Sequence, residues 1–515
     1  MSEGRTNKSL KNIFTGLIYK FIGIFCPFII RTIMIKELGA DYIGLNQLFT
    51  SILQVLSLTE LGIGNAMVYS MYKPMAEGDT DKICALLSLC KKLYRIIGII
   101  VLVIGIVILP FLGKLIKGGY PSDINIYILY LIYLFNTVIS YFLFAYKKSI
   151  LDAKQEVSIE NTIYTVISLG MYLCQVFALL YTKNYYIYLI FLPISTMLLN
   201  LIRNYIINRK YPVYACRGNI DNESLKEFYE KIKALIGDKI GGIVLWFADS
   251  IVISAFLGLQ TLAIYSNYYY IMNAIVGIMA IIYNSVLASV GNSLVTETKE
   301  KNHIDFMVLN FMNLWIVSWC AICLLCLYQP FMQVWMGAKL MLPFSSVILF
   351  CLYFYGWLFN KIGNTYINAA GLWNKEFWRP YVSSGINLIF NIFLVKRIGL
   401  PGVLLSTIIS SVIIDTTWET YVLYKYLFRI SCRKYIIKLI YHAIITILCA
   451  IVTYYICNII AINNNISIIF YRLAICIVVP NFLLWIIYKN NIEYKTIKVK
   501  YKEILKRNWH LYFYE

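Results

Sequence analysis

The chain has few charged residues and almost no histidine. Of its 515 residues only 14% are Asp, Glu, Lys or Arg and three are His, whereas 60% are hydrophobic. Since a soluble domain carries about 25% charged residues, a globular core in water is excluded and a lipid bilayer is the expected solvent. The apolar runs do not alternate with polar residues as barrel strands do. They therefore predict an all-α polytopic membrane protein.

Motifs for nucleotide hydrolysis and for hydrolytic catalysis are also missing. The chain contains no G-x-x-x-x-G-K-[ST] phosphate loop, no H-E-x-x-H and no G-x-S-x-G. The connections expected on the outer side are short. They leave no room for the outer loop with which membrane enzymes of glycan assembly usually hold two substrates. We therefore predict a transporter rather than an enzyme, with no catalytic residues and no cofactor.

Cysteines are present, but they lie mostly inside apolar runs. Cys320, Cys323 and Cys326 share one predicted helix at a spacing of three residues. No histidine or carboxylate lies within a few residues to complete a ligand set. We interpret these cysteines as small apolar packing residues, and we predict neither a metal site nor a disulfide framework.

Long hydrophobic runs dominate the rest of the sequence. We predict about fourteen transmembrane helices, near residues 13–35, 42–70, 94–113, 124–146, 160–182, 185–206, 234–257, 260–290, 304–328, 341–360, 377–395, 400–424, 436–460 and 464–488. The first run follows a polar stretch, is too long for a signal peptide and lacks a small-residue cleavage site. We therefore expect it to stay in the membrane.

The basic residues follow this pattern of spans. Of the 46 Lys and Arg residues, 35 lie in alternate connections and termini, 7 lie in the intervening connections and 4 lie within spans. This bias is what the positive-inside rule predicts, so both termini are expected in the cytoplasm. The net charge of +20 would then face anionic lipids. Binding to nucleic acid is not expected, because the basic residues form no single patch.

The largest inner connection divides the chain into halves. The predicted organisation is an N-terminal six-helix lobe at 1–208, a cytoplasmic linker at 209–233, a C-terminal six-helix lobe at 234–428, two additional transmembrane helices at 429–488 and a basic cytoplasmic tail at 489–515. Within the linker, the stretch that starts at Asn222 is expected to open a short amphipathic helix on the membrane surface.

The two halves are related at an offset of 219 residues. KFIGIFCPFIIRTIMIKELG, which begins at Lys20, aligns without a gap with KIGGIVLWFADSIVISAFLG, which begins at Lys239. Six spans separate the copies, so both copies point the same way. This arrangement predicts a parallel repeat of two six-helix units, with its axis along the membrane normal.

Several charges lie inside predicted spans, where each costs about 2.5–3.5 kcal/mol at a helix centre. Lys20 and Arg31 are eleven residues apart, about three helical turns, and project from one face of the first span. We favour the interpretation that they line a water-filled cavity and attract an anionic head group. The alternative is internal pairing or snorkelling, and Lys239 fits either interpretation.

The acidic residues of the spans have two interpretations. As charge partners, Glu60 would pair with Lys20, and Asp249 with Arg31. As ion or proton sites, Glu60 and Asp249 would act with Asp415 and Glu419, which are one turn apart in the twelfth span. The spacing alone does not choose between these roles. Arg379 is interpreted as an interfacial anchor.

One stretch of the sequence carries a family resemblance. Residues 38–83 contain Gly39, Tyr42, Gly44 and Leu45 after the first span, and then Glu60-Leu61-Gly62-Ile63-Gly64 in the second. This stretch resembles bacterial polysaccharide and O-antigen flippases of the multidrug/oligosaccharidyl-lipid/polysaccharide exporter superfamily. Members often carry aspartate where this chain has Glu60. The fourteen spans and the six-plus-six-plus-two layout agree with the resemblance.

The resemblance implies alternating access between two six-helix lobes, with a cavity lined by spans one, two, seven and eight. It implies that cations in the cavity hold the pyrophosphate of an undecaprenyl-linked sugar. Lys20, Arg31 and Lys239 are the nearest matches. Such cations would compensate a pyrophosphate that cannot cross hydrocarbon unpaired.

The expected function is therefore translocation of lipid-linked oligosaccharide units across the bacterial inner membrane, for O-antigen, lipopolysaccharide, capsule or exopolysaccharide. A polysaccharide polymerase and a chain-length regulator are the expected protein partners, alongside membrane lipids. The alternatives are a cation-coupled drug or metabolite antiporter of the same superfamily, and a membrane enzyme of glycan assembly.

Overall fold

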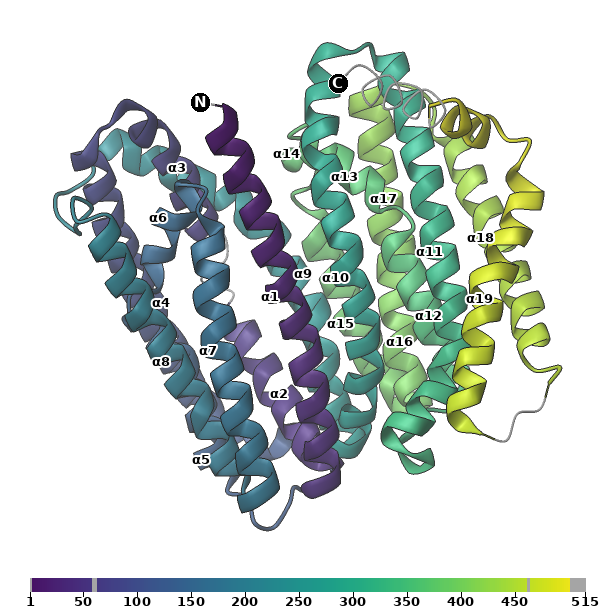
Figure 1. The fold of residues 1–515 in the computed structure, drawn as a ribbon, viewed down its shortest axis with the longest axis horizontal. Coiled ribbons are helices and arrows are strands. Elements are labelled where there is room, and N and C mark those ends of the chain that lie inside the picture. Colours follow the sequence, from purple (N-terminus) through teal and green to yellow (C-terminus); the bar gives the residue numbers. More distant parts are fainter. Residues whose placement is uncertain (1, 58–62, 461–463, 501–515) are drawn as a thin grey trace. The chain divides into compact units, whose positions relative to one another are not determined.

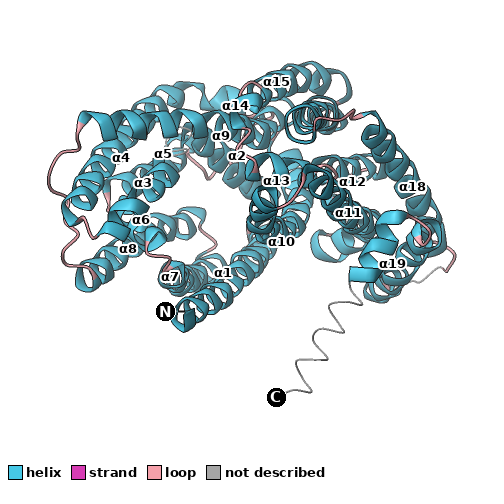
Figure 2. Ribbon diagram, turned by 90° about the horizontal axis from the view of Figure 1, so that it is seen from above, coloured by secondary structure: helices cyan, strands magenta, loops and turns pink. Residues whose placement is uncertain are grey.

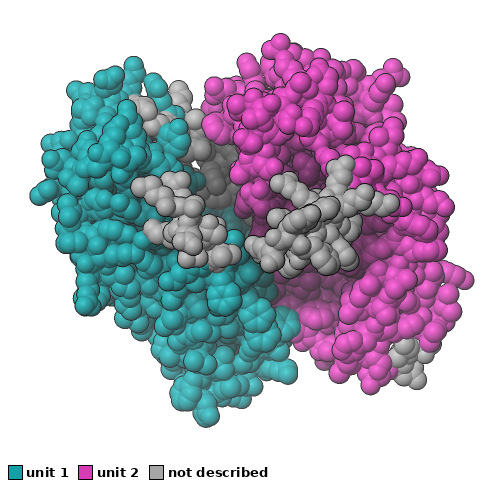
Figure 3. All heavy atoms as spheres, turned by 45° about the horizontal axis from the view of Figure 1, so that its top comes forward, with its two compact units in different colours: residues 1–266 teal, residues 267–515 magenta. Residues whose placement is uncertain are grey.

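The computed structural model describes residues 2–57, 63–460 and 464–500, without the side chains of residues 2–10, 227 and 231–246. The described residues form helices and no strands, so the expected all-α fold is confirmed. The chain divides into two compact units, Met1–Ser266 and Asn267–Glu515 (Figure 3). This division falls inside one helix. The boundaries of the predicted lobes, linker and tail stay predictions.

The first unit consists of long helices with short connections (Figure 1). In chain order they are α1 (Ser2–Glu37), α2 (Ala40–Leu56), α3 (Ile63–Glu77), α4 (Thr80–Ile108), η2 (Leu109–Leu115), α5 (Ile126–Phe142), η3 (Ala145–Lys147), α6 (Lys148–Ala153), α7 (Val157–Phe177), η4 (Ala178–Thr182), α8 (Tyr185–Lys210), α9 (Asn222–Leu257) and the first residues of α10 (Leu259–Thr296). Within this unit α1 packs against α7, and the two run side by side in Figures 1 and 2.

The second unit begins within α10 and also consists of helices with short connections. Its further elements are α11 (Lys299–Met336), η5 (Ala338–Leu340), α12 (Phe344–Leu358), α13 (Lys361–Ala369), α14 (Trp373–Glu376), α15 (Arg379–Ile398), α16 (Leu400–Ile409), η6 (Ser410–Asp415), α17 (Thr416–Val422), η7 (Leu423–Phe428), α18 (Arg433–Cys457) and α19 (Asn465–Tyr488). The last two helices pack against α11 and against each other. A final helical segment covers residues 492–500.

The helix boundaries reproduce the offset found in the sequence. Helices α1 and α9 are each 36 residues long. Gly39 and Gly258, which the offset of 219 aligns, follow them with nearly the same backbone angles, φ 115° and ψ 172° against φ 92° and ψ 174°. Only glycine adopts such angles readily, so both halves use it to turn into the next helix. The same offset relates the N-caps Asp79 and Thr298 of α4 and α11.

Many of the helices can cross a membrane. Among the described residues ten are long and apolar enough, and the bent pair α5 with α6, which turns by 51°, makes eleven. The chain is therefore a multi-pass membrane protein. The predicted second, seventh and eleventh spans fall on α2–α3, α9 and α15, which do not reach that length or hydropathy in the described residues. The number fourteen stays a prediction.

The predicted linker helix is longer than expected. Asp221 caps it by accepting a hydrogen bond from the Ser224 backbone at 2.8 Å, so the start at Asn222 is confirmed. The helix then continues without a break to Leu257. The prediction of a short separate helix is wrong, because no proline interrupts this stretch and its apolar part continues the same helix.

The glycine-containing turn after α1 sets up a close helix contact. Gly44 of α2 faces the start of α10, and a Cβ at this position would lie 2.4 Å from the Leu259 carbonyl oxygen. Leu45, Leu48 and Phe49 of the same helix are fully buried. Gly44, one of the residues that carry the family resemblance, thus has a packing role within the first unit.

Candidate functional site

Arg31 is held by a hydroxyl group on a neighbouring helix. Its Nη1 donates to the Ser266 Oγ at 3.2 Å, and the Arg31 side chain is half-buried. Ser266 is 2% exposed, and its own hydroxyl donates to the Ala263 carbonyl at 2.9 Å. Because that proton is already committed, the Ser266 oxygen presents a lone pair to the guanidinium. A neutral acceptor of this kind helps to orient the Arg31 guanidinium.

Asp249 lies in a buried polar network of the same unit. It is 1% exposed, and the Tyr265 hydroxyl donates to its Oδ2 at 3.4 Å. The next residue, Ser250, accepts a hydrogen bond from Gln47 Nε2 at 3.3 Å. The network therefore joins α2, α9 and the start of α10, which are three of the four predicted cavity spans.

Arg31 and Asp249 reach consecutive residues of α10. Arg31 contacts Ser266, and Asp249 contacts Tyr265. The two charges are thereby brought to one turn of that helix. The predicted ion pair between them stays a prediction, and so does the role of either residue in binding.

Lys20 is exposed although it lies in an apolar span. It belongs to the candidate membrane span Lys11–Glu37, and it has no hydrogen bond or ion pair to any residue that the structure describes. Its neighbour Tyr19 packs edge to face on Tyr164 of α7 at 4.9 Å between ring centroids. Lys20 and Arg31, eleven residues apart, share one face of α1, as predicted from the spacing.

Two of the predicted residues lie outside the description. Glu60 falls in residues 58–62, which the structure does not describe. Its predicted pairing with Lys20 therefore lies outside the described residues as well. Lys239 lies on the backbone of α9, but its side chain is not described.

Asp415 and Glu419 meet a common arginine in the second unit. Arg379 Nη1 lies 2.9 Å from Asp415 Oδ1 and 3.4 Å from Glu419 Oε1, and its Nη2 lies 3.4 Å from Glu376 Oε2. Arg379 is 8% exposed. The interpretation of Arg379 as an interfacial anchor is therefore wrong, because its guanidinium turns inward to compensate carboxylates that would otherwise be buried alone.

Neutral side chains complete this cluster. Asn360 and Asn364 each donate to a different oxygen of Glu419 at 3.0 Å, and the Ser383 hydroxyl donates to Asp415 at 3.0 Å. Three carboxyl groups share one guanidinium here. The cluster joins α13, α14, α15, η6 and α17, and it can hold a proton or cation as well as stabilise the fold.

One buried ion pair was missed by the sequence analysis. Arg203 of α8 donates from Nε to Glu160 Oε2 at 2.8 Å, and its Nη2 pairs with Glu160 Oε1. Both side chains are at least nine-tenths buried. Asn200, one turn earlier on α8, accepts a further hydrogen bond from Arg203 Nη1. Opposite charges near the facing ends of two consecutive predicted spans, 160–182 and 185–206, were the available signal.

The second unit also contains an apolar groove. It encloses about 650 Å³ between α11, α12 and α18, and its lining includes Ile322, Ile348, Ala450, Ile451 and Tyr454. Its walls are almost entirely hydrocarbon and aromatic rings. A groove of this composition fits an acyl or prenyl chain better than a sugar.

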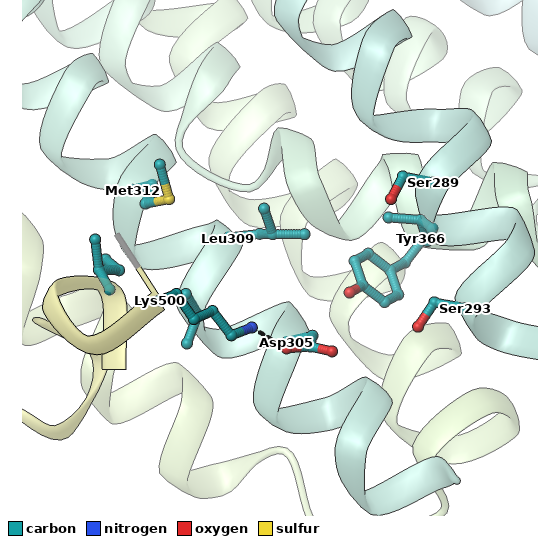
Figure 4. Close-up of a pocket in the computed structure, with 10 residues that line it drawn as sticks. Ser289, Ser293, Asp305, Leu309, Met312, Tyr366 and Lys500 are labelled. Carbon is teal, nitrogen blue, oxygen red and sulfur yellow. Dashed lines mark hydrogen bonds and ion pairs between the residues drawn. The ribbon is translucent and has the colours of Figure 1, made fainter. Parts of the chain in front are cut away.

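A smaller pocket, with apolar as well as polar side chains in its lining, lies where the C-terminal helical segment meets α11 (Figure 4). It encloses about 400 Å³ and is lined by Ser289, Ser293 and Tyr366 among others. Lys500 Nζ pairs with Asp305 Oδ1 at 2.7 Å and thereby ties the segment 492–500 to α11.

The sequence is similar to a known protein family and to a known membrane protein. A family profile described as "Polysaccharide biosynthesis protein" matches residues 9–288. An uncharacterized membrane protein of Methanocaldococcus jannaschii, MJ1068, is 22% identical over 426 residues, which are 78% of this chain and 81% of that protein.

Solved structures show the same fold at low identity. The lipid II flippase MurJ in an inward closed conformation matches with a TM-score of 0.62 and 16% identity, over 95% of this chain and all of that one. An inward-facing multidrug resistance MATE transporter of the MOP superfamily matches with a TM-score of 0.61 and 15% identity, over 80% and 97%. The fold is thus that of MOP-superfamily transporters, as the sequence resemblance predicts. Since the family profile covers more than half of its length, this chain belongs to the polysaccharide biosynthesis protein family.

Proposed function

We propose that this protein is a flippase that moves undecaprenyl-pyrophosphate-linked oligosaccharides from the inner to the outer leaflet of a bacterial inner membrane. The observation that carries the proposal is the cationic face of α1, where Lys20 is exposed within an apolar span and Arg31 is oriented by Ser266. A charge in such a span is costly unless water or an anion compensates it. A pyrophosphate head group supplies that compensation.

The lipid part of the substrate has a matching environment. The prenyl chain can stay in the hydrocarbon while the head group crosses, and the apolar groove between α11 and α12 offers it a wall. The acidic residues Asp249, Asp415 and Glu419 are then candidates for the ion or proton that resets the transporter. One charge moved across 100 mV is worth about 2.3 kcal/mol.

The product would serve surface polysaccharide assembly, such as O-antigen, capsule or exopolysaccharide. On this proposal both termini lie in the cytoplasm, and a polymerase and a chain-length regulator receive the sugar on the outer side. The family to which the chain belongs supports a role in polysaccharide biosynthesis.

Deletion of the gene tests the proposal. Lipid-linked sugar should accumulate on the inner leaflet, where an added lectin or glycosidase reaches it only in inverted vesicles. Reintroducing the intact gene should restore surface glycan. Normal surface glycan in the deletion strain, with no accumulated intermediate, would reject the proposal.

A second function is favoured by one feature. Asp249 is buried beside Tyr265, and MATE transporters share the fold, so a cation-coupled antiporter of drugs or metabolites is the alternative. That function predicts altered sensitivity to toxic cations in the deletion strain, with lipid-linked sugars unchanged. A membrane enzyme of glycan assembly would instead show transferase or polymerase activity from the purified chain.

A further inference from the structure

Three cysteines that are far apart in the sequence meet inside the second unit. Cys326 of α11, Cys457 at the end of α18 and Cys476 of α19 are each 0% exposed. Their three sulfur atoms all lie within 4.8 Å of one another. Only Cys320 and Cys323 lie near Cys326 in the sequence, because Cys457 and Cys476 are 131 and 150 residues further along the chain. The expectation of no metal site was based only on residues that are close to Cys326 in the sequence.

A fourth thiol lies beside this triad. Cys323 is one turn before Cys326 on α11, so both project from the same side of the helix. Its sulfur lies 4.0 Å from the Cys476 carbonyl oxygen. The three helices thus present three thiols and a nearby fourth, which is the donor number of a structural zinc site.

The spacing of the sulfur atoms is close to that of a metal site. Zinc–sulfur bonds are about 2.3 Å long, which places neighbouring sulfur atoms roughly 3.8–4.0 Å apart around one ion. From separations within 4.8 Å, each sulfur needs to move by less than about 1 Å, which a small rotation about χ1 supplies.

A positive charge stands next to the thiols. Arg472, one turn before Cys476 on α19, donates from Nη1 to the Cys326 carbonyl at 3.0 Å and from Nη2 to Asn458 Oδ1 at 2.7 Å. No carboxylate among the described residues lies within ion-pair distance of it, and its buried Nε has no hydrogen-bond partner there. An intramembrane arginine of this kind calls for a nearby negative charge.

We propose that Cys326, Cys457 and Cys476 bind one thiophilic divalent cation of the zinc type, with Cys323 as the fourth ligand and Arg472 as the compensating charge. Binding releases a proton from each thiol that becomes a thiolate. Zinc with four thiolates carries two net negative charges, and the Arg472 guanidinium offsets one of them. The ion would fasten α18 and α19 to α11, next to the buried core formed by Phe311, Ile445 and Tyr488.

Metal titration of the purified, reduced chain in detergent tests this site. Zn²⁺ binding is measured by competition with a chromophoric chelator, and Cd²⁺ binding by its thiolate charge-transfer absorption. We expect one equivalent of either ion. Cys326→Ser, Cys457→Ser and Cys476→Ser should each weaken binding by 100-fold or more. Cys449→Ser is the matched control, because Cys449 is equally buried in the same core but stands outside the triad. It should bind as the unmodified chain does.

Two further measurements separate a metal site from simple packing. Zn²⁺ should raise the thermal midpoint of the unmodified chain and of Cys449→Ser, and should leave the triad variants unchanged. Arg472→Gln should weaken Zn²⁺ binding about 10-fold, in the range of second-shell changes. The proposal is overturned if the reduced chain binds no Zn²⁺ or Cd²⁺, if Cys449→Ser loses the ion along with the triad variants, or if chain extracted without reductant contains a disulfide between two of these cysteines.

Discussion

Arg379 Nη1 donates to Asp415 Oδ1 at 2.9 Å, and this contact joins the first residue of α15 to the last residue of η6. The same guanidinium reaches Glu419 and Glu376. Arg379 compensates three carboxylates that are buried together. Removing it should therefore destabilise the fold before it affects the binding of any ligand.

Arg379→Ala should therefore destabilise the second unit strongly. Leaving buried carboxylates without their counter-charge costs about 3–5 kcal/mol, because desolvation is no longer compensated. The measurement is the thermal midpoint in detergent together with the amount of protein in the membrane fraction. Lys375→Ala, which removes an exposed charge four residues earlier, serves as the control and should change little. Equal stability of the two variants would show that the arginine does not compensate the cluster.

The cationic face of α1 can be tested by matched substitutions on one helix. Lys20→Ala and Arg31→Ala should each lower surface glycan export about 10-fold or more, because a hydrogen bond to a charged group contributes about 1.5–3 kcal/mol. Membrane insertion should be unchanged, as judged by protein abundance in the membrane fraction.

Lys36→Ala provides the comparison for these two variants. Lys36 is an exposed basic residue of α1, but it projects about 140° away from Arg31 around the helix axis. Export should be near normal in this variant. If Lys20→Ala and Arg31→Ala also export normally, neither residue belongs to the binding site.

The buried pair Glu160–Arg203 should show strong coupling in a double-mutant cycle. Each single substitution, Glu160→Gln or Arg203→Met, leaves one buried partner unsatisfied, whereas the double variant removes both charges. The double variant should lose less stability than the two single losses added together, with an interaction energy of about 0.5–3 kcal/mol. Thermal midpoints of the four proteins measure this difference.

An exposed pair in the same unit sets the baseline. Lys148 and Asp152 are 2.8 Å apart in α6 and one turn apart, and their side chains are 48% and 24% exposed. Their coupling should be about 0.3–0.5 kcal/mol, because solvent screens it. A coupling for Glu160–Arg203 no larger than this would mean that burial adds nothing to the pair.

Much of the fold could be predicted because it depends on local patterns. Apolar runs give helices, and a glycine repeated at the same offset gives the same turn in both halves. Asp415 and Glu419 were noticed because charges stand out inside an apolar run. Arg379 was misjudged and Arg203 was missed, because both lie near the ends of such runs, where hydropathy alone assigns charges to connections or the interface.

Contacts between distant segments account for the rest. Nothing near Cys326 in the sequence indicates Cys457 or Cys476, and only the packing of α18 and α19 on α11 brings the three sulfur atoms together. The hydroxyl that holds Arg31 lies 235 residues away, and a serine in an apolar helix carries no signal of that partner.

The repeated glycine turns make a final prediction. Gly39 and Gly258 both have positive φ, so Ala at either position is strained by about 1–3 kcal/mol. At Gly39 nothing lies within 4 Å of an added Cβ, so only backbone strain should act. At Gly258 the Cβ would also come within 2.8 Å of the Lys117 carbonyl oxygen, so Gly258→Ala should lower the thermal midpoint further.

Gly170→Ala is the control, because Gly170 lies in α7 with ordinary helical φ and open space around it. This variant should be neutral or stabilising by up to about 1 kcal/mol. If Gly39→Ala matched Gly170→Ala in stability, the turn would not require glycine, and the agreement in backbone angles between the two halves would have no energetic basis.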